Sequence, residues 1–264
     1  MSAIVDYNQN MIDYQGKLVD FIPILEYGLI SEWNFENNLN DSFGKWNITP
    51  LITPRYVPGK IGYGFDASLN YVYNAIFGLI SPEFLTFMIG FPSWTITFWY
   101  YPRTNSGEYF NSPLLTFQGC PPYEGGYDPS IGITRIIIQS FLRATLSQIE
   151  IRRENLLSSG YDDIDSVLGS SYLRNLYQWY FIVVSSNATS IKLKVYDTST
   201  LIDDTSTKIT RPFFTPDVST VMLMGDPGDS VFLFQNDIVD QMRFYNRDLS
   251  KEVIDAIWNN GVGI

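Results

Sequence analysis

The chain has 264 residues, of which 45% are hydrophobic and 16% aromatic, and its formal net charge is −11 at pH 7. This length suits one large all-β domain, and the apolar content is that of a globular protein with a substantial core. A nucleic-acid partner is not expected, because binding a phosphate backbone requires clustered Lys and Arg, and the chain has no such cluster.

Two residue types are scarce: the sequence has no histidine and one cysteine, Cys120. Imidazole-based catalytic triads and zinc sites are therefore excluded, as are intrachain disulfides and thiolate metal clusters. We expect no signal peptide, since the N-terminal stretch lacks a basic start followed by an apolar core. No apolar run approaches the ~18 residues of a membrane span. These features favour folding in a reducing cytosol and no membrane partner.

The chain begins with residues 1–27, which we interpret as an N-terminal arm. Its apolar residues are interrupted by Pro23, which argues against a regular central strand. An extended arm that contacts a neighbouring molecule and an edge segment of the domain are both consistent with this pattern.

From residue 28 onward, short apolar runs alternate with turn signals rich in Gly, Pro, Asn and Asp. The strongest strand is 94–101, with Trp94, Ile96, Phe98 and Tyr100 on one face. A helical turn is predicted at 81–85, a long loop at 154–175, and a short helix after the N-cap Ser250. The other predicted strands are 28–35, 46–49, 63–66, 71–73, 112–117, 133–141, 144–151, 178–184, 191–197, 205–209, 221–224, 231–234 and 238–245.

So many short strands predict an all-β fold, an antiparallel two-sheet sandwich of Greek-key or jelly-roll type. No linker divides the chain, so we expect one domain over 28–264. We also expect the closing strand, 238–245, to lie beside the first strand, 28–35, with the short C-terminal helix after it.

Five segments in a fixed order resemble the laminin-G-like group of the concanavalin A-like lectin and glucanase superfamily. They are 29–44, 58–66, 94–100, 178–196 and 238–254; in the first, the matching residues are Trp33, Phe35, Asn38, Leu39, Asp41, Ser42 and Gly44. The chain departs from the family at Tyr196-Asp197-Thr198-Ser199, where Tyr-Val-Asp-Gly is usual, and at 119–175, which has no counterpart.

The resemblance implies a structural Ca²⁺ near the first loop and the closing strand. Ca²⁺ takes 6–8 oxygen ligands, and the candidate ligands are Asn38, Asp41, Asp66 and Asp240. The alternative is structural: Asp41 would cap a turn and Asp240 would pair with Arg243 or another basic group.

Two acidic groups are weaker candidates for chemistry. Asp162, Asp163 and Asp165 lack the pattern of an EF-hand and are expected in a solvated loop. Glycoside hydrolysis needs two carboxyl groups about 5–10 Å apart. Glu150 and Glu154 are four residues apart, but their charged neighbours indicate a solvated strand end, and the Glu-x-Asp-x-x-Glu pattern of the related glucanases is absent.

Aromatic residues in the long loops are the candidates for recognition. Sugar sites combine an aromatic platform with hydrogen-bonding side chains. Tyr123, Tyr127, Tyr161 and Tyr172 could form a glycan site, or could pack on the domain or on a neighbouring subunit.

We therefore expect a non-catalytic module that works by surface recognition. The leading hypothesis is a bacteriophage virion component (head decoration, fibre or tail) that is made in the host cytoplasm and contacts other virion proteins, copies of itself or surface glycans. The alternatives are a free carbohydrate-binding lectin and, third, a glycoside hydrolase.

Overall fold

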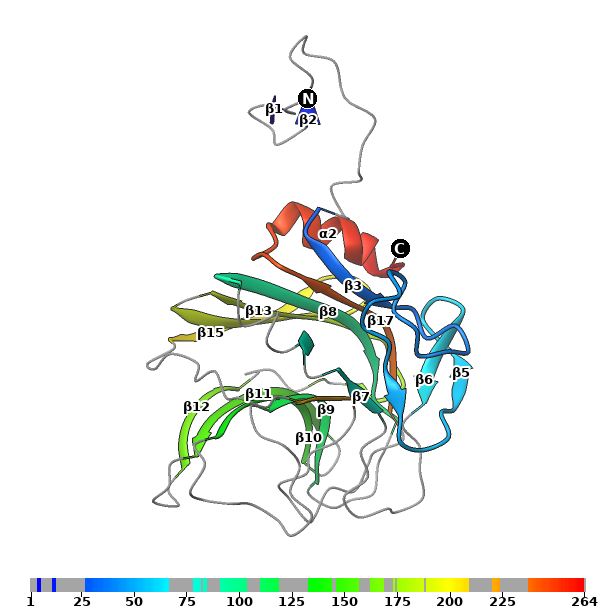
Figure 1. The fold of residues 1–264 in the computed structure, drawn as a ribbon, viewed down its shortest axis with the longest axis horizontal. Coiled ribbons are helices and arrows are strands. Elements are labelled where there is room, and N and C mark those ends of the chain that lie inside the picture. Colours follow the sequence, from blue (N-terminus) through cyan, green and yellow to red (C-terminus); the bar gives the residue numbers. More distant parts are fainter. Residues whose placement is uncertain are drawn as a thin grey trace.

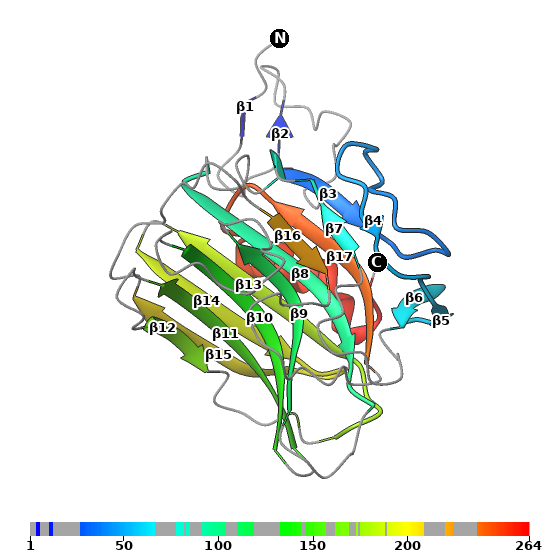
Figure 2. The same ribbon diagram turned by 60° about the horizontal axis from the view of Figure 1, so that its bottom comes forward.

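A computed structural model of the chain is built from antiparallel strands in two main sheets, one above the other (Figure 1). The residues it describes are 4–5, 11–12, 27–66, 78–81, 83–84, 91–103, 110–118, 133–143, 146–156, 162–168, 173, 175–187, 189–208, 220–223 and 237–263. The long strands of both layers run in the same diagonal direction in Figure 2, as in an aligned sandwich. The all-β sandwich predicted from the sequence is confirmed.

The upper layer in Figure 1 is an eight-stranded sheet in the described residues, with the order β15-β14-β13-β8-β17-β6-β5, and β3 paired to β17. Its strands are β3 (Leu29–Trp33), β5 (Tyr56–Pro58), β6 (Tyr63–Asp66), β8 (Ser93–Tyr101), β13 (Tyr180–Asn187), β14 (Ser190–Tyr196), β15 (Leu201–Lys208) and β17 (Ile238–Tyr245).

The lower layer is a seven-stranded sheet in the described residues, with the order β12-β11-β10-β9-β16-β7-β4. Its strands are β4 (Thr49–Pro50), β7 (Gly78–Ile80), β9 (Phe110–Gln118), β10 (Ile133–Arg143), β11 (Leu146–Leu156), β12 (Asp162–Leu168) and β16 (Thr220–Leu223). Two further strands, β1 (Ile4–Val5) and β2 (Met11–Ile12), pair with each other as a separate small sheet.

Strand β8 lies at the centre of the upper sheet and is buried on both faces. The residues that alternate on its inner face, among them Ile96 and Phe98, join the core between the two sheets. On its outer face, Trp99 joins a second apolar cluster. Strict alternation of side chains along a strand explains why one segment serves both cores.

The closing strand β17 pairs antiparallel with the opening strand β3, as predicted. Met242 lies opposite Trp33 in this register, and Phe244 opposite Ser31. The chain then turns and forms helix α2 (Lys251–Trp258), which is followed by the 3-10 turn η1 (Asn259–Gly261). Helix α2 covers the outer face of the upper sheet (Figure 1) and packs Val253, Ile254, Ile257 and Trp258 on Trp99, Phe181 and Tyr245.

The polar segment 154–175 contains a strand where a loop was expected. Strand β12 pairs antiparallel with β11, so that Asp165 lies opposite Arg153 and Asp163 opposite Asn155. The predicted loop is therefore wrong at residues 162–168, which form a strand. At Asp165 the position opposite is the basic Arg153, and an opposite charge across the pair can offset the low strand propensity of Asp.

Other sequence expectations have mixed outcomes. Glu83 and Phe84 are helical, as predicted. In the predicted strand 46–49, Trp46 lies in a bend, residues 47–48 have no regular structure, and Thr49 begins β4. The predicted strands 71–73 and 231–234 lie outside the described residues, as does most of the predicted arm, so the domain boundary at 27/28 stays a prediction. No helix in the described part of the chain has the length and apolar character needed to cross a bilayer.

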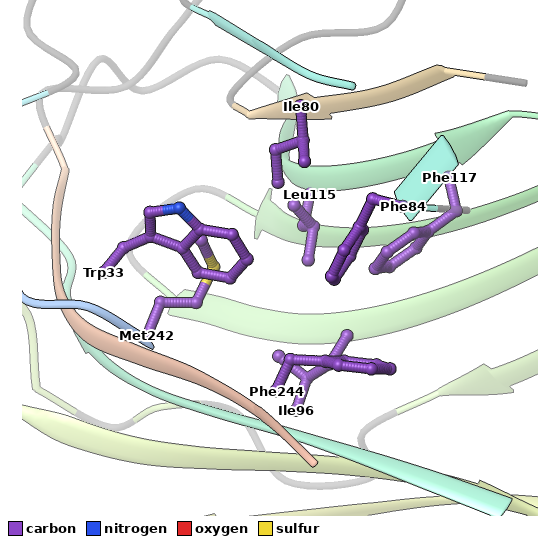
Figure 3. A pocket seen from close by; sticks show the side chains of 8 residues that line it. All are labelled: Trp33, Ile80, Phe84, Ile96, Leu115, Phe117, Met242 and Phe244. Carbon is purple, nitrogen blue, oxygen red and sulfur yellow. The ribbon is translucent and has the colours of Figure 1, made fainter. Parts of the chain in front are cut away.

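A small cavity lies between the sheets where β3, β17, β7 and β9 face one another (Figure 3). Its volume is about 10 Å³ and its lining is apolar, from rings such as those of Trp33, Phe84 and Phe244. Such a space holds about one water-sized sphere without polar partners for it. It is therefore a packing void of the core and not a ligand site.

Candidate functional site

Asp240, predicted as a metal ligand, is a buried carboxylate in an irregular part of β17. The strand register against β8 shifts between Asp240 and Arg243, and Gln241 has a φ of 49°, which is unusual for a residue with a side chain. The Asp240 carboxylate accepts hydrogen bonds from the backbone N–H groups of Ile61 at 2.9 Å and Gln241 at 2.8 Å. Burial raises the pKa of Asp240 to about 7, although these hydrogen bonds oppose the shift.

The turn at residues 59–62 fits closely around this carboxylate. Gly59 is required there, because a Cβ atom at this position would lie 2.6 Å from both Asp240 Oδ2 and the backbone N of Gly64. Lys60 donates a hydrogen bond to the carbonyl of Gly261, and its Nζ lies 4.6 Å from the centre of the Trp99 ring. Asp240 and Lys60 thus fasten the C-terminal segment to the β5–β6 turn.

Asp41 holds its own loop together. Its carboxylate accepts hydrogen bonds from four backbone N–H groups, those of Glu32 at 3.0 Å, Phe43 at 3.3 Å, and Lys45 and Trp46 at 3.1 Å each. Both oxygens are used, because Glu32 and Phe43 bond Oδ1 while Lys45 and Trp46 bond Oδ2. This arrangement corresponds to the turn-capping alternative for Asp41.

Asp66 and Asp237 belong to a third network, at the ends of β6 and β8 and the start of β17. Asp66 forms ion pairs with Arg103 and, at 3.7 Å, with Arg55. Asp237 accepts hydrogen bonds from the Tyr100 hydroxyl at 2.6 Å and from the backbone N–H of Arg103 at 3.0 Å. Burial raises the pKa of Asp237 to about 6.

The four predicted calcium ligands therefore have separate partners. The exposed Asn38 bonds within its own turn, donating to the Glu36 carbonyl and accepting from Asn40 N–H. Among the described residues, no three Asp, Glu, Cys or His side chains gather as a metal site would require. As placed, Asn38, Asp41, Asp66 and Asp240 do not form one set of ligands. Calcium binding through them stays a prediction.

Arg243 does not pair with Asp240. It forms a partly buried ion pair with Glu32 at 2.6 Å, between the neighbouring strands β17 and β3, and donates a second hydrogen bond to Gln241 Oε1 at 3.2 Å. The ion pair links the two ends of the domain.

The remaining predicted site residues are placed only in part. Glu150 and Glu154 both lie on β11. A strand rises about 3.3 Å per residue, so their Cα atoms are about 13 Å apart. Tyr123, Tyr127, Tyr161 and Tyr172 lie outside the described residues.

A surface that the sequence analysis missed lies on the outer face of the upper sheet, at the end of β8. Beyond Trp99 and Phe181, the next outward positions are Tyr101 and Trp179, whose rings pack with centroids 5.1 Å apart and an interplanar angle of 50°. Both rings are partly exposed. The adjacent turn carries Tyr177, which is 62% exposed. We name Tyr101, Tyr177 and Trp179 the aromatic corner. The sequence Tyr177-Gln178-Trp179-Tyr180 was its only local signal.

Comparisons with known proteins identify the fold. No family model matches the sequence, and a search of curated proteins finds no match. Among solved structures, botulinum neurotoxin type C matches with a TM-score of 0.58 at 14% identity over 91% of this chain. Cell entry of that toxin depends on interaction with two ganglioside molecules. A receptor-binding domain matches with a TM-score of 0.58 at 12% sequence identity, and the match covers 93% of this chain and 54% of that domain. A botulinum neurotoxin serotype D/C binding domain matches with a TM-score of 0.57 at 12% identity, and the match covers 88% of this chain and 52% of that domain.

The chain spans about half the length of these structures, since the match covers 52% of the type C toxin chain. At this level of identity the likeness establishes the fold alone. The chain is thus similar in fold to one part of the neurotoxin binding domains.

Proposed function

We propose that the chain is a non-catalytic recognition module that binds a glycan or a glycan-bearing receptor at its surface. The observation that carries the proposal is the aromatic corner. Helix α2 covers Trp99 and Phe181 but leaves the Tyr101–Trp179 pair partly open, with the exposed Tyr177 beside it. Rigid aromatic rings at a surface are common anchors for sugars and for protein partners.

The structural neighbours support this proposal at the level of fold. One is a neurotoxin whose cell entry depends on two gangliosides, and others are receptor-binding and binding domains. Those interactions belong to chains of about twice the matched length, so they suggest the class of partner and not the position of the site.

The carboxylates support a role without catalysis. Asp41, Asp66, Asp237 and Asp240 all hold backbone groups or ion pairs of the framework.

The wider setting that we propose is a bacteriophage particle, in which the module contacts other virion proteins or copies of itself. The lack of disulfides and the acidic composition suit assembly in the cytosol. Mass measurement in solution tests this part: we expect a defined oligomer or a stable complex with a partner chain, and a monomer with full glycan affinity would favour a free lectin.

The recognition proposal is tested by applying the pure chain to an array of diverse glycans, with parallel analysis of the same glycans for cleavage. We expect binding to one structural class and recovery of the intact ligand. A chain that binds no glycan, or that releases shortened sugars from the ligand, contradicts the proposal.

A further inference from the structure

We propose that the turn at residues 175–179 is a glycan-binding site that stacks the apolar face of a neutral pyranose ring on Tyr177, beside the Tyr101–Trp179 pair. This inference rests on the proposed function and adds to it the position of the site and the class of sugar.

Tyr177 is held in a conformation that costs energy. Its φ is 63°, in the left-handed region that a bulky L-residue rarely adopts, and its side chain is 62% exposed. Such a residue is strained by about 1–3 kcal/mol and persists only where the surroundings impose it. Core packing does not account for a ring that projects into solvent. The conformation therefore presents the ring without stabilising the core.

The surroundings that impose this conformation are rigid. The Tyr177 backbone N–H donates to the Pro102 carbonyl at 2.7 Å, which ties the turn to the end of β8. The buried Tyr180 hydroxyl accepts from Asn175 N–H at 3.1 Å and donates to the Asn175 carbonyl at 3.0 Å. The turn is thus fixed on both sides before a ligand arrives, and binding would lose little conformational freedom there.

The Tyr101–Trp179 pair supplies a second apolar surface close to Tyr177. Trp179 packs on the cluster beneath helix α2, so its ring is supported from below. The Tyr177 N–H bonds to Pro102, which directly follows Tyr101 in the chain. The turn and the Tyr101–Trp179 pair therefore lie at the same corner of the sheet. A sugar ring has C–H groups on one face and hydroxyl groups at its edge. The aromatic rings of this corner can pack against the C–H groups.

Amide side chains provide hydrogen-bonding chemistry for the hydroxyls. Asn175 Nδ2 donates to Gln178 Oε1 at 3.1 Å, which orients both amides in the turn. Each amide carries two N–H donors and an acceptor oxygen with two lone pairs. Paired amides next to aromatic rings are suited to the donor and acceptor pattern of vicinal hydroxyl groups.

Charge selects a neutral ligand. Residues 175–180 are Asn-Leu-Tyr-Gln-Trp-Tyr, with no ionisable Lys, Arg, Asp or Glu, and the nearby Arg103 is ion-paired with Asp66. The whole chain has a net charge of −11, which repels anionic lipid surfaces and acidic sugars. A neutral hexopyranose therefore matches the corner better than a sialylated glycan or a membrane.

The test combines a glycan array with three variants of the full chain. Tyr177→Gly removes the ring and also the strain, so the variant is expected to unfold at the same or a higher temperature than the wild type. Tyr177→Phe keeps the stacking surface, and Phe43→Ala removes an aromatic side chain that is 56% exposed in the separate loop held by Asp41. We expect the wild type to bind a neutral glycan, and titration with that glycan to show an affinity loss of about tenfold or more for Tyr177→Gly. That loss is about 1.4 kcal/mol.

We expect Tyr177→Phe and Phe43→Ala to stay within about threefold of the wild type. A wild type that binds no glycan contradicts both the proposed function and this inference. If the wild type binds and Tyr177→Gly binds equally well, recognition stands and this site is wrong. Binding restricted to acidic glycans overturns the neutral-sugar assignment.

Discussion

The carboxylate of Asp240 accepts a hydrogen bond from the backbone N–H of Ile61 at 2.9 Å, although 179 positions separate the two residues. This bond joins the closing strand to the β5–β6 turn, next to the contact of Lys60 with Gly261. It places an acidic group with a raised pKa in the framework, and so makes stability depend on pH.

The first prediction concerns that dependence. Burial raises the pKa of Asp240 from the ordinary value of 3.8 to about 7, and the pKa of Asp237 to about 6. The folded state therefore holds these protons more tightly than the unfolded state, so their stabilising contribution is full below about pH 4 and is lost as pH rises through 6 and 7. We expect the free energy of unfolding, from urea denaturation, to be lower at pH 8 than at pH 5 by on the order of 4 kcal/mol.

The control for this prediction is Asp240→Asn, which cannot ionise. The stability difference between pH 5 and pH 8 should shrink in the variant by more than half, whatever its absolute stability. An unchanged pH profile in Asp240→Asn would show that another group causes the dependence.

The second prediction concerns Asp41 and divalent cations. Four backbone N–H groups bond its two carboxylate oxygens, so the loop is complete without a metal. Asp41→Ala should lower the free energy of unfolding by about 2–4 kcal/mol, because several donors lose their acceptor. Melting the wild type in calcium chloride and in EGTA tests the calcium prediction at this loop. A lower melting temperature in EGTA, absent from Asp41→Ala, would establish a calcium site there.

The third prediction concerns the ion pair of Glu32 and Arg243, whose side chains are 18% and 9% exposed. Truncating one partner leaves the other charge nearly buried, so Glu32→Ala should cost about 3 kcal/mol or more. Replacing both residues by Met should recover much of that loss of stability. The double variant has no charge to desolvate, whereas the ion pair must offset the cost of removing two charges from water. Denaturation of the two variants checks this. Equal stability of Glu32→Ala and the wild type would contradict the role of the pair in joining β3 to β17.

Much of the fold could be predicted because the strands of this sandwich have strong local signals. Strand β8 alternates Ile and Phe with Thr and Trp, and its two faces enter the two cores as the alternation requires. The short apolar stripe after Ser250 also predicts helix α2. Strand β12 was not predicted, because its Asp residues are typical of loops. Its strand conformation is seen in its pairing with β11.

The site was less predictable because its chemistry is non-local. The sequence offered turn capping as one role for Asp41, and its own loop supplies most of the donors. The sequence did not indicate that the distant backbone N–H of Ile61 would bond to Asp240. The φ of Tyr177 is set in a turn held by the bond of its N–H to Pro102 and by the bonds of Asn175 to the Tyr180 hydroxyl, and it has no sequence pattern of its own. The expected loop tyrosines lie outside the described residues.

The most direct test of recognition through the aromatic corner is ¹⁹F NMR of the chain labelled with fluorotryptophan. Of the six tryptophans, Trp33, Trp46, Trp94, Trp99 and Trp258 are each at most 8% exposed, while Trp179 is partly exposed at the corner. With the resonance assigned by Trp179→Phe, we predict that titration with the glycan found on the array shifts the Trp179 signal and leaves the other five nearly unchanged. A saturable shift at other tryptophans with Trp179 unmoved would contradict recognition at this corner.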